Sequence, residues 1–319
     1  MVPAIHHEHR RAWRASILEA AGMLRISILM LGLTATSIAS ALNVFVCEPE
    51  WGSLVREVAG DKAETTIATT AFQDPHRLQA RPSLIAAVRR ADLIVCTGAD
   101  LEIGWLPLLL RRAGNPDIKP GNPGYFLAAD HVRRIEIPAS IDRAQGDVHP
   151  QGNPHIHLHP RNIERVADAL AERLSKIDPS NSAFYESRLD DFLNRWGEAR
   201  DQWEDRAAQL EGMRLASHHR SFSYLADWLD LDIVATLEPK PGIPTSGAQL
   251  AVLLEQLSPN PPAGVIRTPY ENEKPSQWLA ERLKIAEIML PFTIGGTSDS
   301  VDLFSLYDET MRMLEEHHR

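Results

Sequence analysis

Short apolar runs typical of buried strands alternate with helix-like stretches through both halves of the sequence. Strands separated by helices form βαβ units and a parallel sheet. The sequence therefore predicts an α/β fold with a parallel-sheet βα core in each half. The expected strands lie at 43–47, 64–70, 92–96 and 133–138 in the first half, and at 214–217, 233–236, 265–267 and 288–290 in the second.

Between these halves, residues 181–210 contain no proline and a single glycine, Gly197. At 1.5 Å per residue, such a helix could run roughly 45 Å. We interpret it as a rigid connector between two lobes; a helix packed along one lobe is the alternative. The expected organisation is a signal segment at 1–41, an N-terminal α/β lobe at 42–180, a connecting helix at 181–211 and a C-terminal α/β lobe at 212–319.

The N-terminal segment has the pattern of a secretory signal. From Met23 the chain passes through Arg25 and an apolar run to small residues ending at Ala41. This pattern predicts cleavage just before Leu42, and Met23 is an alternative start. The apolar run is too short for a convincing transmembrane helix. We therefore expect an exported, periplasmic protein.

Two cysteines remain after this segment, each at the end of an apolar strand-like run. Phe45 and Val46 precede Cys47 where a lipobox needs a small residue, so we expect no lipid anchor. If the two strands are parallel neighbours, roughly 4.8 Å apart, Cys47 and Cys96 could form a disulfide. Two buried thiols are an equal alternative.

Residues 146–160 hold four of the chain's thirteen histidines, interrupted by prolines and glycines that exclude a helix. Histidine is the commonest metal ligand, although clustered histidines can also form a solvated loop. In parallel sheets, ligands bind at loops beyond the carboxyl ends of the strands. Four such loops carry candidate ligands for a tetrahedral Zn²⁺ site. The candidates are His76, His155, His219 and Asp299.

Several motifs together resemble a known family. They are DPHRLQARPS at 74–83, ADLIVCTGADLE at 91–102, GNPHIHLHP at 152–160, HRSFSYL at 219–225 and GGTSDS at 295–300. The chain is similar, from about Leu42 to its end, to the cluster A-I metal-binding solute receptors of ABC importers, which bind zinc or manganese. The resemblance implies a metal between two lobes and places the family's ligands at the four residues proposed above.

The resemblance also implies a function. A histidine at position 219, where manganese receptors tend to carry a carboxylate, favours Zn²⁺ over Mn²⁺. We expect a monomeric receptor that delivers zinc to an ABC permease in the inner membrane, without catalysis. The net charge of −10 argues against nucleic-acid binding. The alternatives are a manganese receptor, a periplasmic zinc chaperone, a metal-stabilised structural protein and a secreted zinc hydrolase, although neither H-E-x-x-H nor G-x-S-x-G is present.

Some nearby residues have more than one interpretation. His218 is an alternative to its neighbour His219, which the family's spacing favours. His157 and His159 are expected to support the site, and His149 to be an ordinary loop residue. Two acidic residues, Asp74 and Glu238, are expected beside the ligands, with Asp74 orienting an imidazole through its N–H.

Overall fold

The computed structural model describes residues 41–140 and 149–318. Residues 41–319 group into one compact unit. The predicted signal segment lies outside the described residues, apart from Ala41. Among the helices of these ranges, none is both long enough and apolar enough to cross a membrane.

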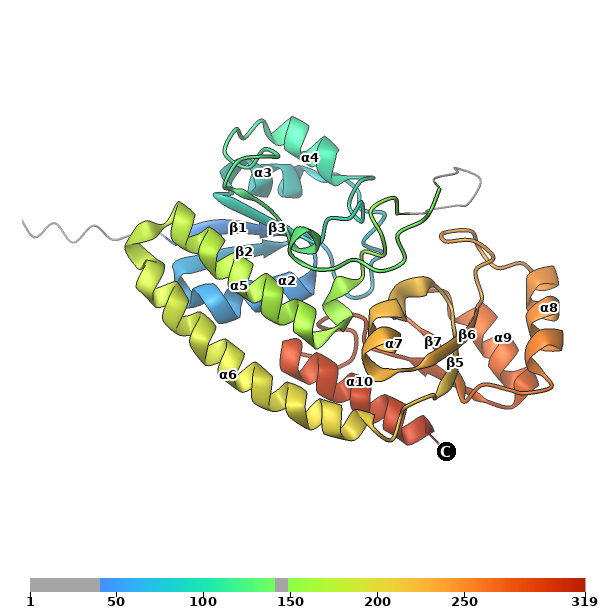
Figure 1. Ribbon diagram of the computed structural model, residues 1–319. Helices are drawn as coiled ribbons and strands as arrows, with labels where there is room; N and C mark the ends of the chain where they lie inside the picture. The colour runs from blue at the N-terminus through green and yellow to red at the C-terminus, as the bar shows by residue number, and fades with distance from the viewer. Residues whose placement is uncertain (1–40, 141–148, 319) are drawn as a thin grey trace, which may run out of the picture. The chain divides into compact units, whose positions relative to one another are not determined.

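The first sheet contains four parallel strands in the order β2-β1-β3-β4. Strand β3 is buried along its whole length, as expected for a parallel sheet covered on both faces. Because successive side chains of a strand point to opposite faces, Leu93 and Val95 pack toward α2 and α5, whereas Ile94 and Cys96 pack toward α3 and α4 (Figure 1). The elements are β1 (Leu42–Val46), α2 (Pro49–Ala59), β2 (Ala63–Ile67), α3 (Pro82–Arg90), β3 (Leu93–Cys96), α4 (Leu106–Ala113) and β4 (Tyr125–Leu127).

The second sheet repeats this arrangement in the order β6-β5-β7-β8, again with all strands parallel. Its core lies around β7, whose four residues are all buried. These two parallel sheets confirm the predicted α/β fold class. The elements are β5 (Arg214–Ser217), α7 (Ser223–Leu229), β6 (Asp232–Thr236), α8 (Gly247–Leu257), β7 (Gly264–Arg267), α9 (Glu273–Leu283), β8 (Ala286–Met289) and α10 (Leu303–His317).

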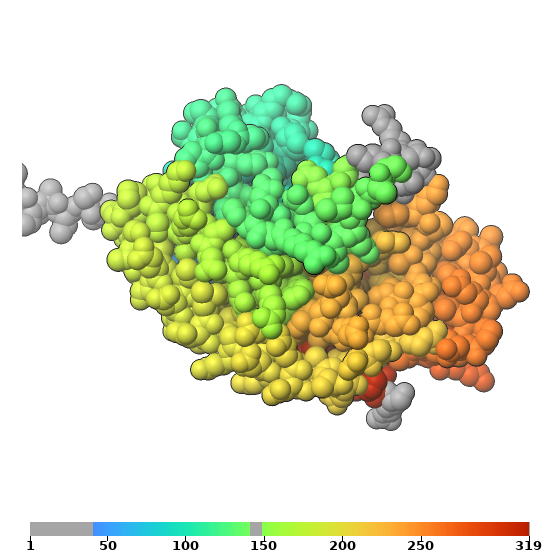
Figure 2. All heavy atoms as spheres, viewed as in Figure 1, coloured from blue at the N-terminus to red at the C-terminus, as the bar shows by residue number. Residues whose placement is uncertain are grey.

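Two consecutive helices, α5 (Pro160–Ile177) and α6 (Ser182–Ala207), separate the sheets in the sequence. Helix α6 packs along α5 and α10 (Figure 1), and most of its residues remain accessible, so its outer face lies at the surface (Figure 2). Two buried tryptophans on one side of α6 hold the helix in place. The indole of Trp196 donates a hydrogen bond to the Pro160 carbonyl at 3.1 Å, and the indole of Trp203 donates one to the Asp308 carboxylate at 2.7 Å. The division into two lobes at 181–211 stays a prediction.

The predicted strand at 133–138 is wrong. The fourth strand of the first sheet is β4, where Phe126 is fully buried and pairs with Val95. Residues 133–138 pair with no strand in the described part of the chain, and Glu136 has a positive φ of 54°. Three charged residues and a proline without an N–H suit this stretch poorly to a buried sheet position. It packs instead on the loop of His155, where the Asn153 N–H donates to the Ile135 carbonyl at 2.9 Å.

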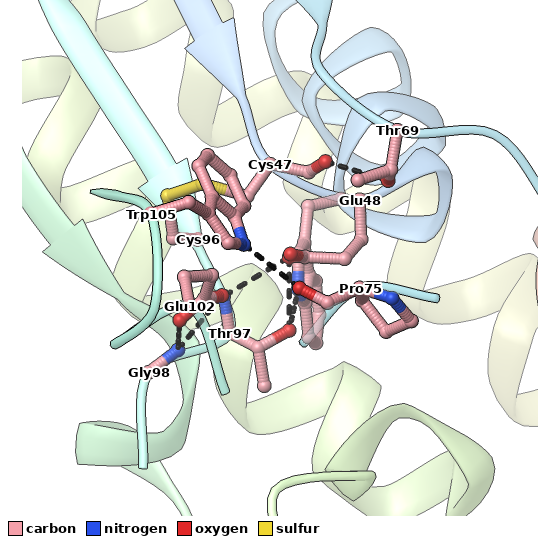
Figure 3. The surroundings of a disulfide bond; sticks show 10 residues. Cys47, Glu48, Thr69, Pro75, Cys96, Thr97, Gly98, Glu102 and Trp105 are labelled. Atoms are coloured by element: carbon pink, nitrogen blue, oxygen red, sulfur yellow. Dashed lines mark hydrogen bonds between the residues drawn. A yellow bond between two sulfur atoms is a disulfide. The ribbon is translucent and has the colours of Figure 1, made fainter. Parts of the chain in front are cut away.

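The two cysteines form a disulfide at the ends of β1 and β3, with a Cα–Cα distance of 4.8 Å. Figure 3 shows the buried carboxylates of Glu48 and Glu102 beside it, both accepting the Thr97 N–H, and burial raises the pKa of Glu102 to about 7. The indole of Trp105 links this cluster to the Pro75 carbonyl at 2.8 Å. The disulfide thus lies next to the loop that carries His76.

Removing this cross-link should lower stability without changing the fold. The bond closes a sequence separation of 49 residues, and disulfides of this kind typically contribute about 2–5 kcal/mol by restricting the unfolded chain. The Cys47→Ala/Cys96→Ala double variant should lose a free energy of unfolding in that range, measured by urea denaturation followed through tryptophan fluorescence. An unchanged denaturation midpoint would contradict this.

Candidate metal centre

Three histidines from three different loops converge on one point. His76 follows β2, His155 precedes α5 and His219 follows β5, and one ring nitrogen of each lies within 4.8 Å of the others. The ring centroids are 5.6–6.0 Å apart, with interplanar angles of 78–82°. Nitrogen ligands at 2.0–2.1 Å from a tetrahedral zinc are roughly 3.3 Å apart. Small side-chain movements would therefore bring the three imidazoles onto a common ion.

His76 is oriented by the residue two positions before it. The Asp74 carboxylate accepts hydrogen bonds from the His76 backbone N–H at 3.0 Å and from ring Nδ1 at 2.7 Å. Burial would raise the pKa of Asp74, but the hydrogen bonds and charge of His76 lower it overall. The proton is thereby held on Nδ1, which leaves Nε2 with a lone pair available to a metal. This is the orienting role that the sequence predicted for Asp74.

His219 has the same arrangement on the second sheet. Its Nδ1 lies 2.7 Å from Oε2 of Glu238, and the Gly242 N–H donates to the same oxygen at 2.9 Å. Burial lowers the pKa of His219, but the hydrogen bond and charge of Glu238 outweigh that effect, so the pKa is raised. Two of the three imidazoles therefore have a carboxylate on one nitrogen and offer the other nitrogen to the site.

His155 differs because its side chain has no such partner. It is 1% exposed, and neither ring nitrogen has a hydrogen-bond partner among the described residues. Burial and the neighbouring histidines lower its pKa well below the ordinary value, so the ring is neutral. A buried polar group without a partner costs roughly 1–3 kcal/mol. A ligand at the centre of the group would offset that cost.

The fourth predicted ligand is not part of this group. Asp299 lies in the loop after β8, and its side chain is exposed. The three-histidine group within 4.8 Å contains no carboxylate. The structure therefore brings together three of the four predicted ligands.

His149, which was predicted to be an ordinary loop residue, lies close to His76. Nε2 of His149 lies 3.2 Å from Nε2 of His76, with the ring centroids 5.2 Å apart. The one sequence feature that could have indicated a role for His149 at the site is its place in the histidine-rich stretch 146–160. Distance along a loop does not show which histidines turn toward the site.

The remaining histidines of this region make other contacts. His157 is buried between Glu50, at 3.3 Å from Nδ1, and the Phe292 carbonyl, at 2.8 Å from Nε2. His159 caps the first turn of α5 by accepting the Arg161 N–H. His218 is buried beside His219, outside the three-histidine group. His157 and His159 thus fix the loop of His155 rather than join the group.

The group opens onto two hollows. One, of about 470 Å³, is lined by His149, His155, His219 and Lys240, among others. The other, of about 330 Å³, includes His76, and its wall carries the Glu271 carboxyl, which accepts the Thr268 N–H at 2.8 Å. Burial raises the pKa of Glu271 to about 7. An ion could reach the group from either side.

Comparisons with known proteins identify the family of this chain. The family described as "Zinc-uptake complex component A periplasmic" matches residues 44–317. The manganese ABC transporter substrate-binding lipoprotein PsaA of Streptococcus pneumoniae is 26% identical over 196 residues, covering 60% of each chain. The metal ABC transporter substrate-binding lipoprotein SsaB of Streptococcus sanguinis is 28% identical over 164 residues, covering 50% of each. The chain thus spans three fifths or less of the length of these curated relatives.

Solved structures show the same fold at low identity. A crystal structure of ZnuA has a TM-score of 0.69 at 21% identity, covering 86% of this chain and 99% of that one. The periplasmic metal binding protein of Candidatus Liberibacter asiaticus has a TM-score of 0.70 at 16% identity, covering 86% and 99%. At these identities the likeness concerns the fold alone.

The Glu238 contact predicts a pH dependence of metal binding. Protons compete with a metal for Nε2 of His219, so the zinc dissociation constant should be flat above the raised pKa of His219 and increase as the pH falls through it. The Glu238→Gln variant loses the charge that raises this pKa, so its increase should begin at a lower pH. Calorimetric titrations across a pH series measure both onsets. An onset that stays in place or moves upward would contradict the assignment.

Proposed function

The chain belongs to the family of periplasmic zinc-uptake components, and we propose that it captures Zn²⁺ and delivers it to the permease of an ABC importer. The observation that carries this proposal is the buried His155, whose two ring nitrogens have no hydrogen-bond partner among the described residues. It lies beside two imidazoles that carboxylates already orient. This arrangement supports the proposal of a binding site for a borderline metal ion. We propose His76, His155 and His219 as its ligands.

The choice of zinc over manganese rests on the chemistry of the group. Imidazole nitrogen suits zinc, whereas Mn²⁺ prefers carboxylate and other oxygen ligands. The three-histidine group contains no carboxylate, and Asp299 is exposed. A manganese receptor is the runner-up, because several relatives are named as manganese ABC transporter substrate-binding lipoproteins.

The proposed location is the periplasm, after removal of a signal peptide and without a lipid anchor. The Cys47–Cys96 disulfide supports an oxidising compartment. The relatives named above are lipoproteins, so the predicted absence of an anchor is a point of difference from them. We propose that the receptor acts as a monomer and meets its permease at the inner membrane.

A zinc hydrolase is the one alternative that the geometry itself raises. Three histidines with a fourth position open to water are also the ligand set of some catalytic zinc sites. The family consists of transporter substrate-binding proteins rather than enzymes. We therefore propose binding and release, with no chemical step.

Calorimetric titration of residues 42–319 with Zn²⁺ tests the proposal. We expect one site with a dissociation constant below about 1 μM. The His76→Ala, His155→Ala and His219→Ala variants should each weaken binding by more than the 10–100-fold typical of residues that only orient a ligand. His318→Ala, an exposed histidine just beyond the end of α10, is the matched control and should bind like the parent.

Two outcomes would overturn the assignment: zinc binding weaker than micromolar in the parent, or all three variants binding as it does. A stopped-flow assay with an ester substrate addresses the hydrolase alternative, since zinc-dependent turnover would favour an enzyme.

A further inference from the structure

We propose that His149 is the fourth protein ligand of the metal held by His76, His155 and His219. This inference rests on the proposed function, because it requires those three residues to bind a metal. The fourth ligand would then be His149, from the histidine-rich stretch 146–160, and not Asp299, which the sequence predicted. The site would then be made entirely of imidazole nitrogens.

The spacing of two nitrogen atoms is the first argument. Nε2 of His149 and Nε2 of His76 are 3.2 Å apart. Two nitrogens bound to one tetrahedral zinc at 2.0–2.1 Å are separated by roughly 3.3 Å. This pair has the spacing of two ligands of a single ion. His149 lies outside the group of nitrogens within 4.8 Å of one another, so its ring would have to move toward His155 and His219 to share their ion.

The proton positions allow the same pair to bind a metal. His76 keeps its proton on Nδ1, facing Asp74, so its Nε2 accepts a hydrogen bond from Nε2–H of His149. When a metal replaces that contact, the proton of His149 must leave Nε2 for Nδ1. This exchange moves a proton within the His149 ring and so changes its tautomer.

The turn that carries His149 is fixed by the backbone. The Gly152 N–H donates to the His149 carbonyl at 3.1 Å. Gly152 has a φ of +102°, and a Cβ there would lie 2.8 Å from the Ile135 oxygen, so only glycine fits this close approach. The next residue, Asn153, donates to the same Ile135 oxygen at 2.9 Å. The turn is therefore anchored two residues before His155, and His149 lines the same hollow as His155 and His219.

A fourth imidazole would sharpen the choice of metal. With Asp299 as a ligand, the set would contain a carboxylate, which binds Mn²⁺ well. With His149, all four donors are nitrogens, which favour Zn²⁺ and Co²⁺ over Mn²⁺. His149 thus contributes to specificity as well as to affinity.

The test uses Co²⁺ as a spectroscopic probe alongside Zn²⁺ titrations of residues 42–319. In the parent, Co²⁺ should give the intense visible bands of a four-coordinate tetrahedral site. His149→Ala should weaken zinc binding about 10–100-fold and change those bands, because water replaces a nitrogen. Asp299→Ala and the control His318→Ala should leave both measurements unchanged.

A second variant gives a positive signal that a purely structural residue would not produce. In His149→Cys, a thiolate at the ligand position should add a sulfur-to-cobalt charge-transfer band in the near ultraviolet. That band would support direct coordination even if His149→Ala were unstable.

The outcomes separate this inference from the proposed function. If His76→Ala abolishes binding while His149→Ala matches the parent and His149→Cys gives no charge-transfer band, His149 is not a ligand and the proposed function stands. A loss of metal binding in Asp299→Ala would also overturn the inference. If the parent binds neither zinc nor cobalt, both proposals fail together.

Discussion

An imidazole buried without a hydrogen-bond partner is costly. In the part of the chain that the structure describes, His155 is such an imidazole, and it lies where loops of both sheets meet. The groups around His155 are arranged so that a bound ion would offset this cost. Asp74 and Glu238 each hold the proton of a neighbouring imidazole on Nδ1, so that Nε2 of His76 and of His219 is left for a metal. Each carboxylate is itself fixed by a backbone N–H, which limits how far its histidine can turn. The site is thus organised before any ion binds, and binding should require only small side-chain movements.

The fold makes this convergence possible because parallel strands deliver their following loops to one edge of each sheet. The loop of His155 is held from beneath by His157, which bridges Glu50 of α2 and the Phe292 carbonyl beyond β8. The Tyr307 hydroxyl donates to the His157 carbonyl at 2.6 Å and so adds α10 to the same support. Neighbouring histidines of one stretch therefore have different tasks: His155 faces the site, and His157 joins the elements below it.

Some features have signals that can be read locally along the sequence. Helix α5 begins at Pro160, which suits a first helical position, and ends before Pro179, so both of its ends could be predicted. The fourth strand was misplaced because β4 has only three residues and its burial depends on pairing with β3, which is not visible along the chain. Asp299 and His149 illustrate a similar limit at the site. Spacing shows that a loop reaches the edge of a sheet, but the direction of a side chain depends on contacts such as the Gly152 turn against Ile135. Of the ligand set predicted from spacing and from the family resemblance, the structure brings His76, His155 and His219 together and leaves Asp299 exposed.

The central claim is that His76, His155 and His219 bind one zinc ion. Anomalous X-ray scattering at the zinc absorption edge, from crystals of residues 42–319 grown with Zn²⁺, tests it most directly. The account predicts one dominant peak about 2.0–2.1 Å from a ring nitrogen of each of the three histidines. A dominant peak elsewhere, or crystals that hold no zinc between these imidazoles, would contradict it.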